Sequence, residues 1–307
     1  ASERVQAREY EIFCSVRDMV KAQFTSIKST SESLAMLDVL ASLAVVAQQN
    51  NYVRPDVDVS DEINIVEGRH PVVETVLKDT LFVPNSMYLD CQSSRMMILT
   101  GPNMAGKSTY MRQNAMIILM AQIGSFVPAK SAHIGIVDKI FTRVGASDDL
   151  ASGQSTFMLE MLEVANILKN ATSRSFLVFD EIGRGTSTYD GMSIAKAVVE
   201  YVVNKKKIGA KTLFATHYHE LCELADTVEG VVNFNVAVKK RGDNIVFLKK
   251  IIPGGTDDSF GIEVAALAGI DSWIVKRAKE ILKELETDGK VKIITKYESD
   301  DSQLSMS

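Results

Sequence analysis

The chain has 307 residues, of which 46% are hydrophobic and 24% are charged. This composition is ordinary for a globular protein, and the length allows one large domain or two modest ones around a sizeable core. A net charge of -5 gives no overall attraction to nucleic acid, so we expect any DNA partner to find most of its phosphate contacts elsewhere. The cysteines lack CxxC spacing, which argues against a zinc site or a disulfide framework and is typical of a reducing cytosol. They are Cys14, Cys91 and Cys222.

Neither a membrane span nor a secretory signal is predicted. The longest apolar run, 115–127, contains Gln122 and Gly124 and is too short to cross a bilayer. The first ten residues alternate charged and polar types, unlike a signal peptide. We therefore expect a cytoplasmic protein without a membrane partner. The chain does not begin with Met, which is typical of a fragment excised from a longer protein.

Two amphipathic helices are predicted in the first part of the chain. Apolar residues recur at helical spacing from Ile12 to Ile27 and again from Leu34 to Ala44. Ser31 or Ser33 is expected to cap the second helix. Because neither helix carries reactive groups, we interpret 1–50 as a helical hairpin or as the end of a longer lever.

From about residue 63 the pattern changes to short apolar strands that alternate with helices. This alternation predicts an α/β fold, in which a mostly parallel sheet has helices on both faces. The expected strands are Met96–Thr100, Lys139–Arg143, Phe176–Phe179 and Thr212–Thr216, and the expected helices are Lys107–Gln122, Phe157–Asn170 and Gly191–Asn204.

A hairpin and a helical pair are expected after this alternation. The segments 231–238 and 244–251 alternate in polarity around a turn, which predicts an antiparallel hairpin. A pair of helices follows within 256–286, with Gly269 as the expected cap between them. The segment 287–307 is polar with little periodicity and is expected to be disordered.

A phosphate-binding loop is predicted between the expected strand Met96–Thr100 and the expected helix Lys107–Gln122. The segment from Gly101 to Ser108 fits the pattern GxxxxGK[ST] in the strand–loop–helix context that the pattern needs. The backbone N–H groups of such a loop surround the phosphates of ATP or ADP. Lys107 should reach the β- and γ-phosphates, and the Ser108 hydroxyl should ligate Mg²⁺. A glycine-rich turn with a chance lysine is the alternative. The expected phosphate-binding residues are Gly101, Pro102, Asn103, Met104, Ala105, Gly106, Lys107, Ser108 and Thr109.

Polar side chains follow two further apolar strands, Phe176–Phe179 and Thr212–Thr216. Asp180 is expected to help hold Mg²⁺, and Glu181 to orient or deprotonate the attacking water. Acidic residues where a strand simply enters solvent are the alternative. After the next strand, His217 is expected to sense the γ-phosphate, since this strand end points at the same edge of a parallel sheet. A purely structural histidine, or His219 in this role, is the alternative.

A second anion-binding site is predicted where another helix begins. Ser152, Gly153, Ser155 and Thr156 are small residues before the helix that starts near Phe157, and they expose backbone N–H groups there. Because we expect this helix start to lie too far along the fold to reach its own phosphate-binding loop, it suggests a dimer in which each subunit completes its neighbour's site. An ordinary capped helix start is the alternative.

Several long motifs resemble one family. GPNMAGKSTYMRQ, SGQSTFMLEM, DEIGRGTSTYDG and FATHYHEL, in this order, resemble the ATPase domain of the MutS family of DNA mismatch-repair proteins, within the ABC-type ATPase superfamily. EGRHPVVE and SFGIEVAALAG support the same resemblance, which covers about 60–285. Ala105 departs from the glycine often found there, although a small residue fits a closely packed helix. Phe82 resembles the aromatic residue that stacks on adenine in this family; a core phenylalanine at a strand edge is the alternative.

The resemblance also implies a biological setting. ATP binding and hydrolysis would switch a DNA-bound clamp between scanning and sliding states. The partners would be a second copy, bound through the ATPase domain and a C-terminal helix-turn-helix, and the downstream repair factor MutL. DNA would be bound through N-terminal domains of the full-length protein. The family's mismatch-reading Phe-x-Glu occurs only as Phe179-Asp-Glu181, which is committed to the nucleotide, so no mismatch recognition is expected.

We therefore divide the chain into four parts: 1–50, the helical end of a lever domain; 51–255, a P-loop ATPase domain; 256–286, a helix-turn-helix for dimerisation; and 287–307, a tail. Three alternatives stay open. They are the nucleotide-binding subunit of a membrane transporter, a MutS-like paralogue acting on recombination intermediates or stalled ribosomes, and a nucleotide sensor that does not hydrolyse.

Overall fold

The computed structural model contains two β-sheets, and helices cover both faces of the larger one. It describes residues 2–77, 80–102, 105–145, 155–241, 244–255 and 260–285. The larger sheet is six-stranded, in the order β10-β9-β4-β8-β7-β6, and only β10 runs antiparallel to its neighbour. The strands are β4 (Met96–Thr100), β6 (Ile140–Arg143), β7 (Phe176–Asp180), β8 (Lys211–Ala215), β9 (Val231–Arg241) and β10 (Asn244–Pro253). The mostly parallel sheet predicted from the sequence is confirmed.

The central strands are apolar because both faces of the sheet are covered. Every residue of β4 and of β8 is buried, as expected for parallel strands between two layers. Their register pairs Leu99 with Ala215, and Ala215 in turn pairs with Asp180 of β7. The carboxyl ends of β4, β7 and β8 therefore lie side by side at one edge of the sheet.

A smaller mixed sheet lies beside the larger one and was not predicted. Its order is β1-β5-β2-β3, with β1 (Asp56–Asp58), β2 (Ile63–Gly68), β3 (Asn85–Leu89) and β5 (Ser131–Gly135). Buried and less buried residues alternate along β3, because only one face of this sheet packs inward. The short strands and their irregular register left no clear pattern in the sequence.

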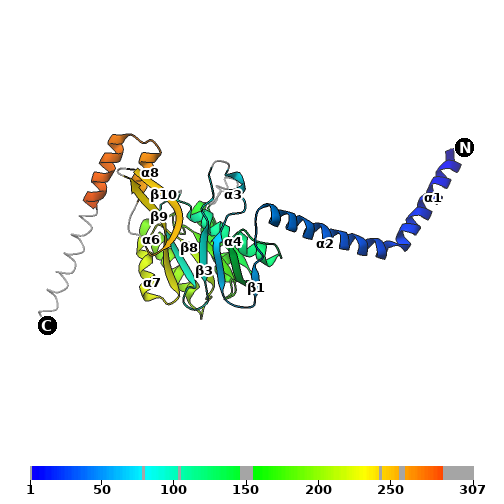
Figure 1. The fold of residues 1–307 in the computed structure, drawn as a ribbon, viewed down its shortest axis with the longest axis horizontal. Coiled ribbons are helices and arrows are strands. Elements are labelled where there is room, and N and C mark those ends of the chain that lie inside the picture. Colours follow the sequence, from blue (N-terminus) through cyan, green and yellow to red (C-terminus); the bar gives the residue numbers. More distant parts are fainter. Residues whose placement is uncertain are drawn as a thin grey trace.

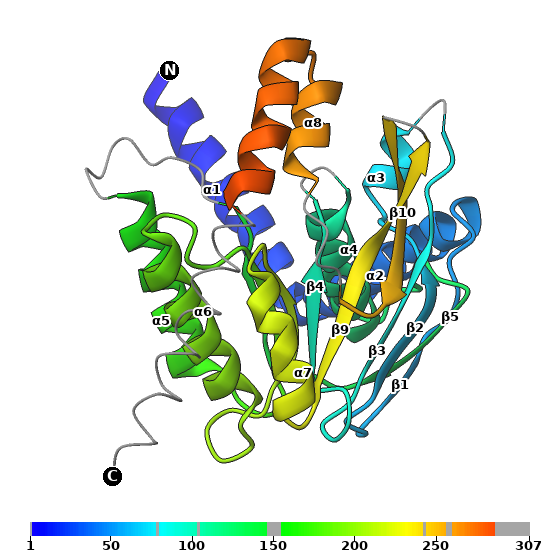
Figure 2. The same cartoon turned by 90° about the vertical axis from the view of Figure 1, so that its left-hand side faces the viewer.

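Two apolar cores fill the space between these layers. Helix α4 (Lys107–Gln122) lies between the two sheets and shares one core with both of them. Helices α5 (Thr156–Asn170) and α6 (Thr188–Val203) cover the opposite face of the larger sheet and share the second core. Figure 2 shows these layers edge-on, with helices on both faces of the larger sheet. Short helices α3 (Val73–Val76), η1 (His219–Glu223) and α7 (Leu224–Thr227) complete the body.

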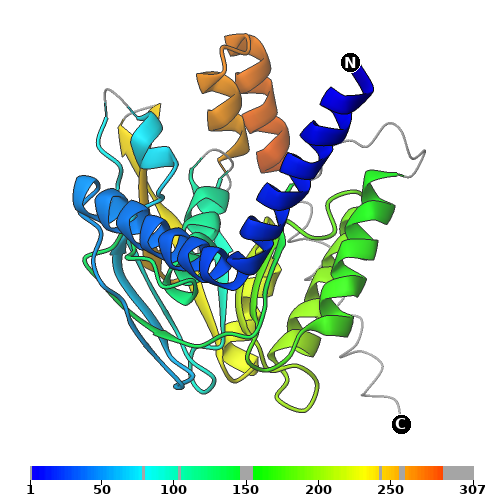
Figure 3. The same cartoon turned by 90° about the vertical axis from the view of Figure 1, so that its right-hand side faces the viewer.

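An arm of two helices projects from the body at the N-terminal end (Figures 1 and 3). Helix α1 (Ser2–Ala22) and α2 (Phe24–Gln49) meet at a bend instead of forming a hairpin. The predicted cap at Ser31 or Ser33 is wrong, because the helix already begins at Phe24. The Ser33 hydroxyl instead donates to the carbonyl of Ser29 one turn earlier, a bond that serine can form inside a helix.

Helix α2 is also long and apolar enough to cross a membrane by length and composition, which the sequence analysis did not anticipate; it is the one such helix in the described part of the chain. This is weak evidence for a membrane span, because core helices and signal sequences share these properties.

At the opposite end of the molecule, α8 (Gly261–Leu267) and a helix over 272–285 form a pair (Figure 1). Gly269 lies between them with a φ of 84°, the left-handed conformation expected of a helix cap.

The core over the central strands gives a stability prediction. Phe214 on β8 is fully buried and lies 5.9 Å, ring to ring, from Phe179 on β7. Phe214→Ala should lower the free energy of unfolding by about 3–5 kcal/mol, since it leaves a cavity in a close-packed layer. The matched control is Leu248→Ala on β10, where the side chain is 42% exposed. Urea unfolding measures both; equal midpoints for the two variants would contradict this packing.

Candidate functional site

The glycine-rich segment after β4 turns the chain from strand to helix. Gly106 caps α4 with a φ of 107°, a conformation that glycine adopts without the steric cost of a side chain. Ala105 is fully buried, in agreement with the expectation that a small residue fits this closely packed position. Asn103 and Met104, two of the predicted phosphate-binding residues, lie outside the described residues.

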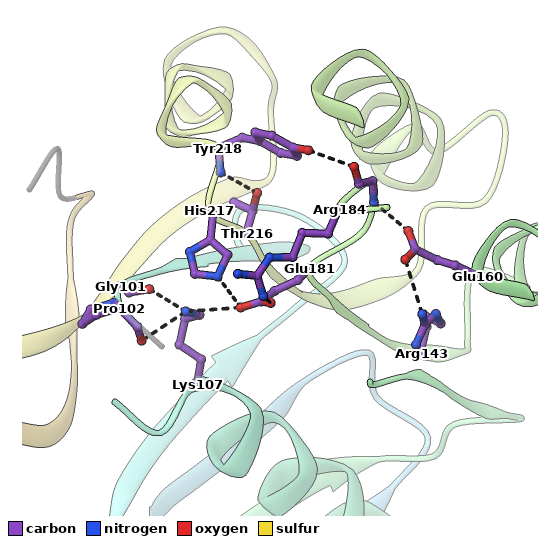
Figure 4. Close-up of polar contacts among 11 residues, drawn as sticks. Gly101, Pro102, Lys107, Arg143, Glu160, Glu181, Arg184, Thr216, His217 and Tyr218 are labelled. Atoms are coloured by element: carbon purple, nitrogen blue, oxygen red, sulfur yellow. Dashed lines mark hydrogen bonds and ion pairs between the residues drawn. The ribbon is translucent and has the colours of Figure 1, made fainter. Parts of the chain in front are cut away.

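Lys107 lies at the centre of the site, on the first turn of α4. Its side chain is 3% exposed, and its Nζ donates to the carbonyls of Gly101 at 2.5 Å and Pro102 at 3.3 Å. The same nitrogen lies 3.6 Å from Oε1 of Glu181 (Figure 4). Burial lowers the pKa of Lys107, and the charge of Glu181 acts in the opposite direction. A buried ammonium group is therefore held between a loop and a carboxylate.

Asp180 and Ser108 form a second polar pair next to Lys107. Burial raises the pKa of Asp180, and the neighbouring Ser108 side chain lowers it. Both residues line one cavity. Oδ1 of Asp180 is buried and has no hydrogen-bond partner among the described residues. A buried carboxylate oxygen without a partner, beside a hydroxyl, is a donor set that suits a hard cation such as Mg²⁺.

Glu181 is held in a strained backbone conformation immediately after β7. Its φ is 58°, which is uncommon for a residue with a side chain and often marks an active site. Its backbone N–H donates to the carbonyl of Ala215 at 2.9 Å. Its carboxylate accepts hydrogen bonds from His217 and Arg184. The end of β7 thus directs this carboxylate toward the ends of β4 and β8.

The electrostatics of this cluster keep Glu181 ionised. Burial raises its pKa, but the hydrogen bond and charge of His217 act against burial. The charges of Lys107 and Arg184 act in the same direction as His217, and together they lower the pKa of Glu181 from 4.5 to about 2. His217, rather than His219 at the start of η1, is thus the histidine that the structure brings to Glu181.

Phe82 lines a separate cavity next to the first turn of α4. This cavity has a volume of about 170 Å³, and Gly106, Thr109 and Tyr110 also line it. Phe82 itself is half-buried. The structure thus places this ring beside the first turn of α4, next to the predicted phosphate-binding residues.

The start of α5 lines the same cavity as Ser108 and Asp180, the candidate metal ligands. Thr156 lines a cavity of about 480 Å³ together with Ser108, Asp180 and Glu181. Ser155 caps α5 by accepting from the N–H of Met158 at 3.2 Å, and it is exposed, as Thr156 is. The expectation that this helix start lies far from its own phosphate-binding loop is therefore wrong, since the parallel sheet places both at one edge. Ser152 and Gly153 lie outside the described residues.

Sequence reasoning missed several side chains at this edge. Arg112 and Arg143 line the same cavity as Asp180, and Glu160 bonds both to Arg143 and to the backbone of Gly183. Arg143 ends an apolar strand. The same position, a polar residue at the end of an apolar strand, identified Asp180 as a candidate site residue but was not applied to Arg143. Glu160 lies within the motif SGQSTFMLEM, four residues after Thr156 and so on the same helical face.

The pKa of Glu181 gives a prediction about pH. The Glu181 carboxyl, followed by carbon-13 NMR, should titrate near 2 in the folded protein. Because this lies below the ordinary value of 4.5, the pairing stabilises the fold above that pH, and this contribution is lost as the pH falls toward 2.

His217→Ala should move this midpoint upward, because it removes the hydrogen bond that lowers the pKa. His133→Ala is the matched control, since His133 pairs with Asp58 on the smaller sheet. A wild-type midpoint near 4.5, or the same shift in both variants, would contradict the assignment.

Comparisons with known proteins agree with the motifs. The family model for MutS domain V matches residues 97–286. The DNA mismatch repair protein MutS of Caldicellulosiruptor bescii is 60% identical over 286 residues, which is 93% of this chain and 33% of that protein. The MutS proteins of Acetivibrio thermocellus and Clostridium botulinum are 62% and 56% identical, over 93% and 94% of this chain and 33% and 31% of their own. The chain thus spans about a third of the length of the curated relatives it matches. It belongs to the MutS family, through the family's domain V.

Proposed function

We propose that this chain binds and hydrolyses ATP with Mg²⁺, as a P-loop ATPase of the ABC type. One observation carries the proposal: Lys107, the consecutive residues Asp180 and Glu181, and His217 come from three separate segments and meet at the carboxyl ends of β4, β7 and β8. A cation, two carboxylates and a histidine behind a glycine-rich turn can bind phosphates, hold a metal ion and position water for phosphoryl transfer.

In this proposal the loop and α4 hold the phosphates. Lys107 would exchange its contacts with the carbonyls of Gly101 and Pro102 for the β- and γ-phosphates. The backbone N–H groups at the start of α4 and the helix dipole would add favourable interactions with the anion. Thr109 and Gly106 continue this surface toward Phe82, which would stack on the adenine ring.

Ser108 and Asp180 would hold Mg²⁺, which would neutralise negative charge on the phosphates. Among the described residues, no group of three or more His, Cys, Asp or Glu side chains could hold a metal ion by itself. This agrees with the preference of Mg²⁺ for one or two protein oxygens together with phosphates and water.

Glu181 would orient or deprotonate the attacking water, and His217 would contact the γ-phosphate. The low pKa of Glu181 favours its ionised form, which is the form that accepts a hydrogen bond from water. An intact Glu181 is also the reason to prefer hydrolysis over a nucleotide sensor that only binds. Arg184, which contacts the same carboxylate, would have to move to admit the water.

Membership of the MutS family gives this activity its proposed setting. The relatives are named as DNA mismatch repair proteins, and we propose that this chain acts in the cytoplasm as the ATPase module of such a protein. Nucleotide state would be coupled to a DNA clamp, with DNA held by the N-terminal part of the longer protein and MutL as the downstream partner. The chain would dimerise through 51–255 and through a helix-turn-helix within 256–286, with 1–50 as the end of the lever.

The division of roles between Lys107 and Glu181 gives the first test of the proposal. Lys107→Ala should strongly weaken ATP binding, because the buried cation is lost. Glu181→Gln should retain binding but slow turnover by about 10²-fold or more, since it removes the base. Calorimetry and phosphate release measure the two effects.

Lys196→Ala and Glu200→Gln are the matched controls, since both side chains are exposed on α6. Both should behave as the wild type. Unchanged ATPase activity in Glu181→Gln would contradict the assignment of this carboxylate.

A second test asks whether Ser155 and Thr156 act on the partner's γ-phosphate. Both residues are exposed, so a second subunit could reach them, although Thr156 also lines its own chain's cavity. If they act across a dimer, mixing Lys107→Ala with Ser155→Ala chains should create one intact composite site and restore part of the lost activity. Specific activity should also rise with protein concentration. No rescue on mixing, with activity independent of concentration, would instead favour action within one chain.

A further inference from the structure

Glu160 is a buried carboxylate that has no role in the proposed chemistry. It lies on α5, four residues after Thr156, and is 7% exposed. Its Oε1 accepts from the backbone N–H of Gly183 at 2.6 Å, and its Oε2 lies 3.3 Å from Nη2 of Arg143 (Figure 4). A buried charge is costly unless it is paired and hydrogen-bonded. Both carboxylate oxygens of Glu160 are therefore fixed in direction.

Arg143 fastens the same helix to the sheet. This residue ends β6 and is 4% exposed. Its Nε lies 2.9 Å from Oε2 of Glu163, one turn after Glu160 on α5. The ion pairs of Arg143 with Glu160 and Glu163 join the first turns of α5 to the end of β6, although its Nε and Nη1 make no hydrogen bond within the described residues.

Gly183, on the other side of Glu160, has no room for a side chain. Its φ is 88°, and a Cβ atom there would lie 2.5 Å from the carbonyl oxygen of Gly191 on α6. Its own carbonyl accepts from the Tyr218 hydroxyl at 3.0 Å. A Cβ on Gly185 would lie 2.9 Å from Phe157 of α5. The loop after Glu181 is thus held by α5, α6 and the segment that carries His217.

Glu181 lies two residues before Gly183, and its backbone is strained. Such a conformation persists only where contacts with the surrounding structure hold it in place. We infer that Glu160 is a positioning residue, which holds the Glu181 carboxylate against Lys107 and His217 through the N–H of Gly183. Because Glu160 and Thr156 lie on one face of α5, a displacement at the start of this helix reaches the carboxylate through the same contact. This inference rests on the proposed hydrolysis, in which Glu181 acts on water.

Steady-state kinetics test the positioning role. A carboxylate that is misplaced by about 1 Å can slow turnover by about 10²-fold, so Glu160→Ala should lower kcat to about this extent while KM for ATP stays near the wild-type value. Glu160→Gln should recover most of the loss, since its amide oxygen can accept from the Gly183 N–H. The matched control is Glu163→Gln, which pairs with the same Arg143 but is 60% exposed and does not contact the loop.

A double variant covers the case in which Glu160→Ala does not fold. Arg143→Met with Glu160→Leu replaces the buried pair by apolar side chains of similar size, which proteins often tolerate without loss of stability. It still removes the acceptor for the Gly183 N–H and should show the same fall in kcat. Wild-type kcat in whichever of the two variants folds would overturn the positioning role.

Amide hydrogen exchange on the nucleotide-free protein tests the contact separately from catalysis. Exchange at the Gly183 N–H should be slow in the wild type and in Glu163→Gln, and should rise by about tenfold or more in Glu160→Ala as the bond is lost. Unchanged exchange would overturn the contact. A wild-type chain that binds ATP without hydrolysing it would defeat the proposed function, whereas the exchange result would still decide whether Glu160 holds this loop.

Discussion

The register of the parallel strands β4, β8 and β7 is the constraint on which the site depends. Leu99, Ala215 and Asp180 lie in one row across these strands, so the residues that follow each strand emerge together. Parallel strands hold this alignment only when both faces of the sheet are covered, as the two cores do here. The apolar strands are thus buried in register, and this alignment brings together the polar residues that follow them.

The charges at this edge are paired with one another. Lys107 contacts backbone carbonyls and Glu181, and Glu181 contacts His217 and Arg184. Burial alone would neutralise such groups, and their mutual attraction is what keeps Glu181 ionised. A phosphate anion would compete with Glu181 for Lys107, because both groups are acceptors. Binding of nucleotide would therefore redistribute these contacts without requiring new charged groups, and this links the described geometry to the proposed chemistry.

Much of the larger sheet could be predicted from the sequence, because its strands are apolar runs that end in distinctive residues. The strand Met96–Thr100 and the helix Lys107–Gln122 have the predicted bounds. The smaller sheet was missed because its strands are short and irregularly paired. The break between α1 and α2 was misplaced because Ser33, a good capping residue, bonds within the helix instead. Both failures reflect tertiary or local contacts that override intrinsic preference.

The site itself was predicted less completely. Lys107, Glu181 and His217, named from motifs and strand ends, lie in contact at one edge of the sheet, but their chemical roles stay predictions. Glu160 and Arg143 were not named, because a strand-end arginine and a glutamate on a helix do not indicate by themselves that the two side chains pair. The position of Thr156 in the same cavity as its own chain's Ser108 also depends on sheet topology, which spacing along the chain does not reveal.

The most direct test of the central claim is a crystal structure of this chain with Mg²⁺ and an ATP analogue that resists hydrolysis. The account predicts the γ-phosphate on the Lys107 ammonium group, the metal on Ser108 and Asp180, and the Glu181 carboxylate facing the γ-phosphate across a water molecule. An analogue bound away from the start of α4, or a metal that does not contact Asp180, would contradict it.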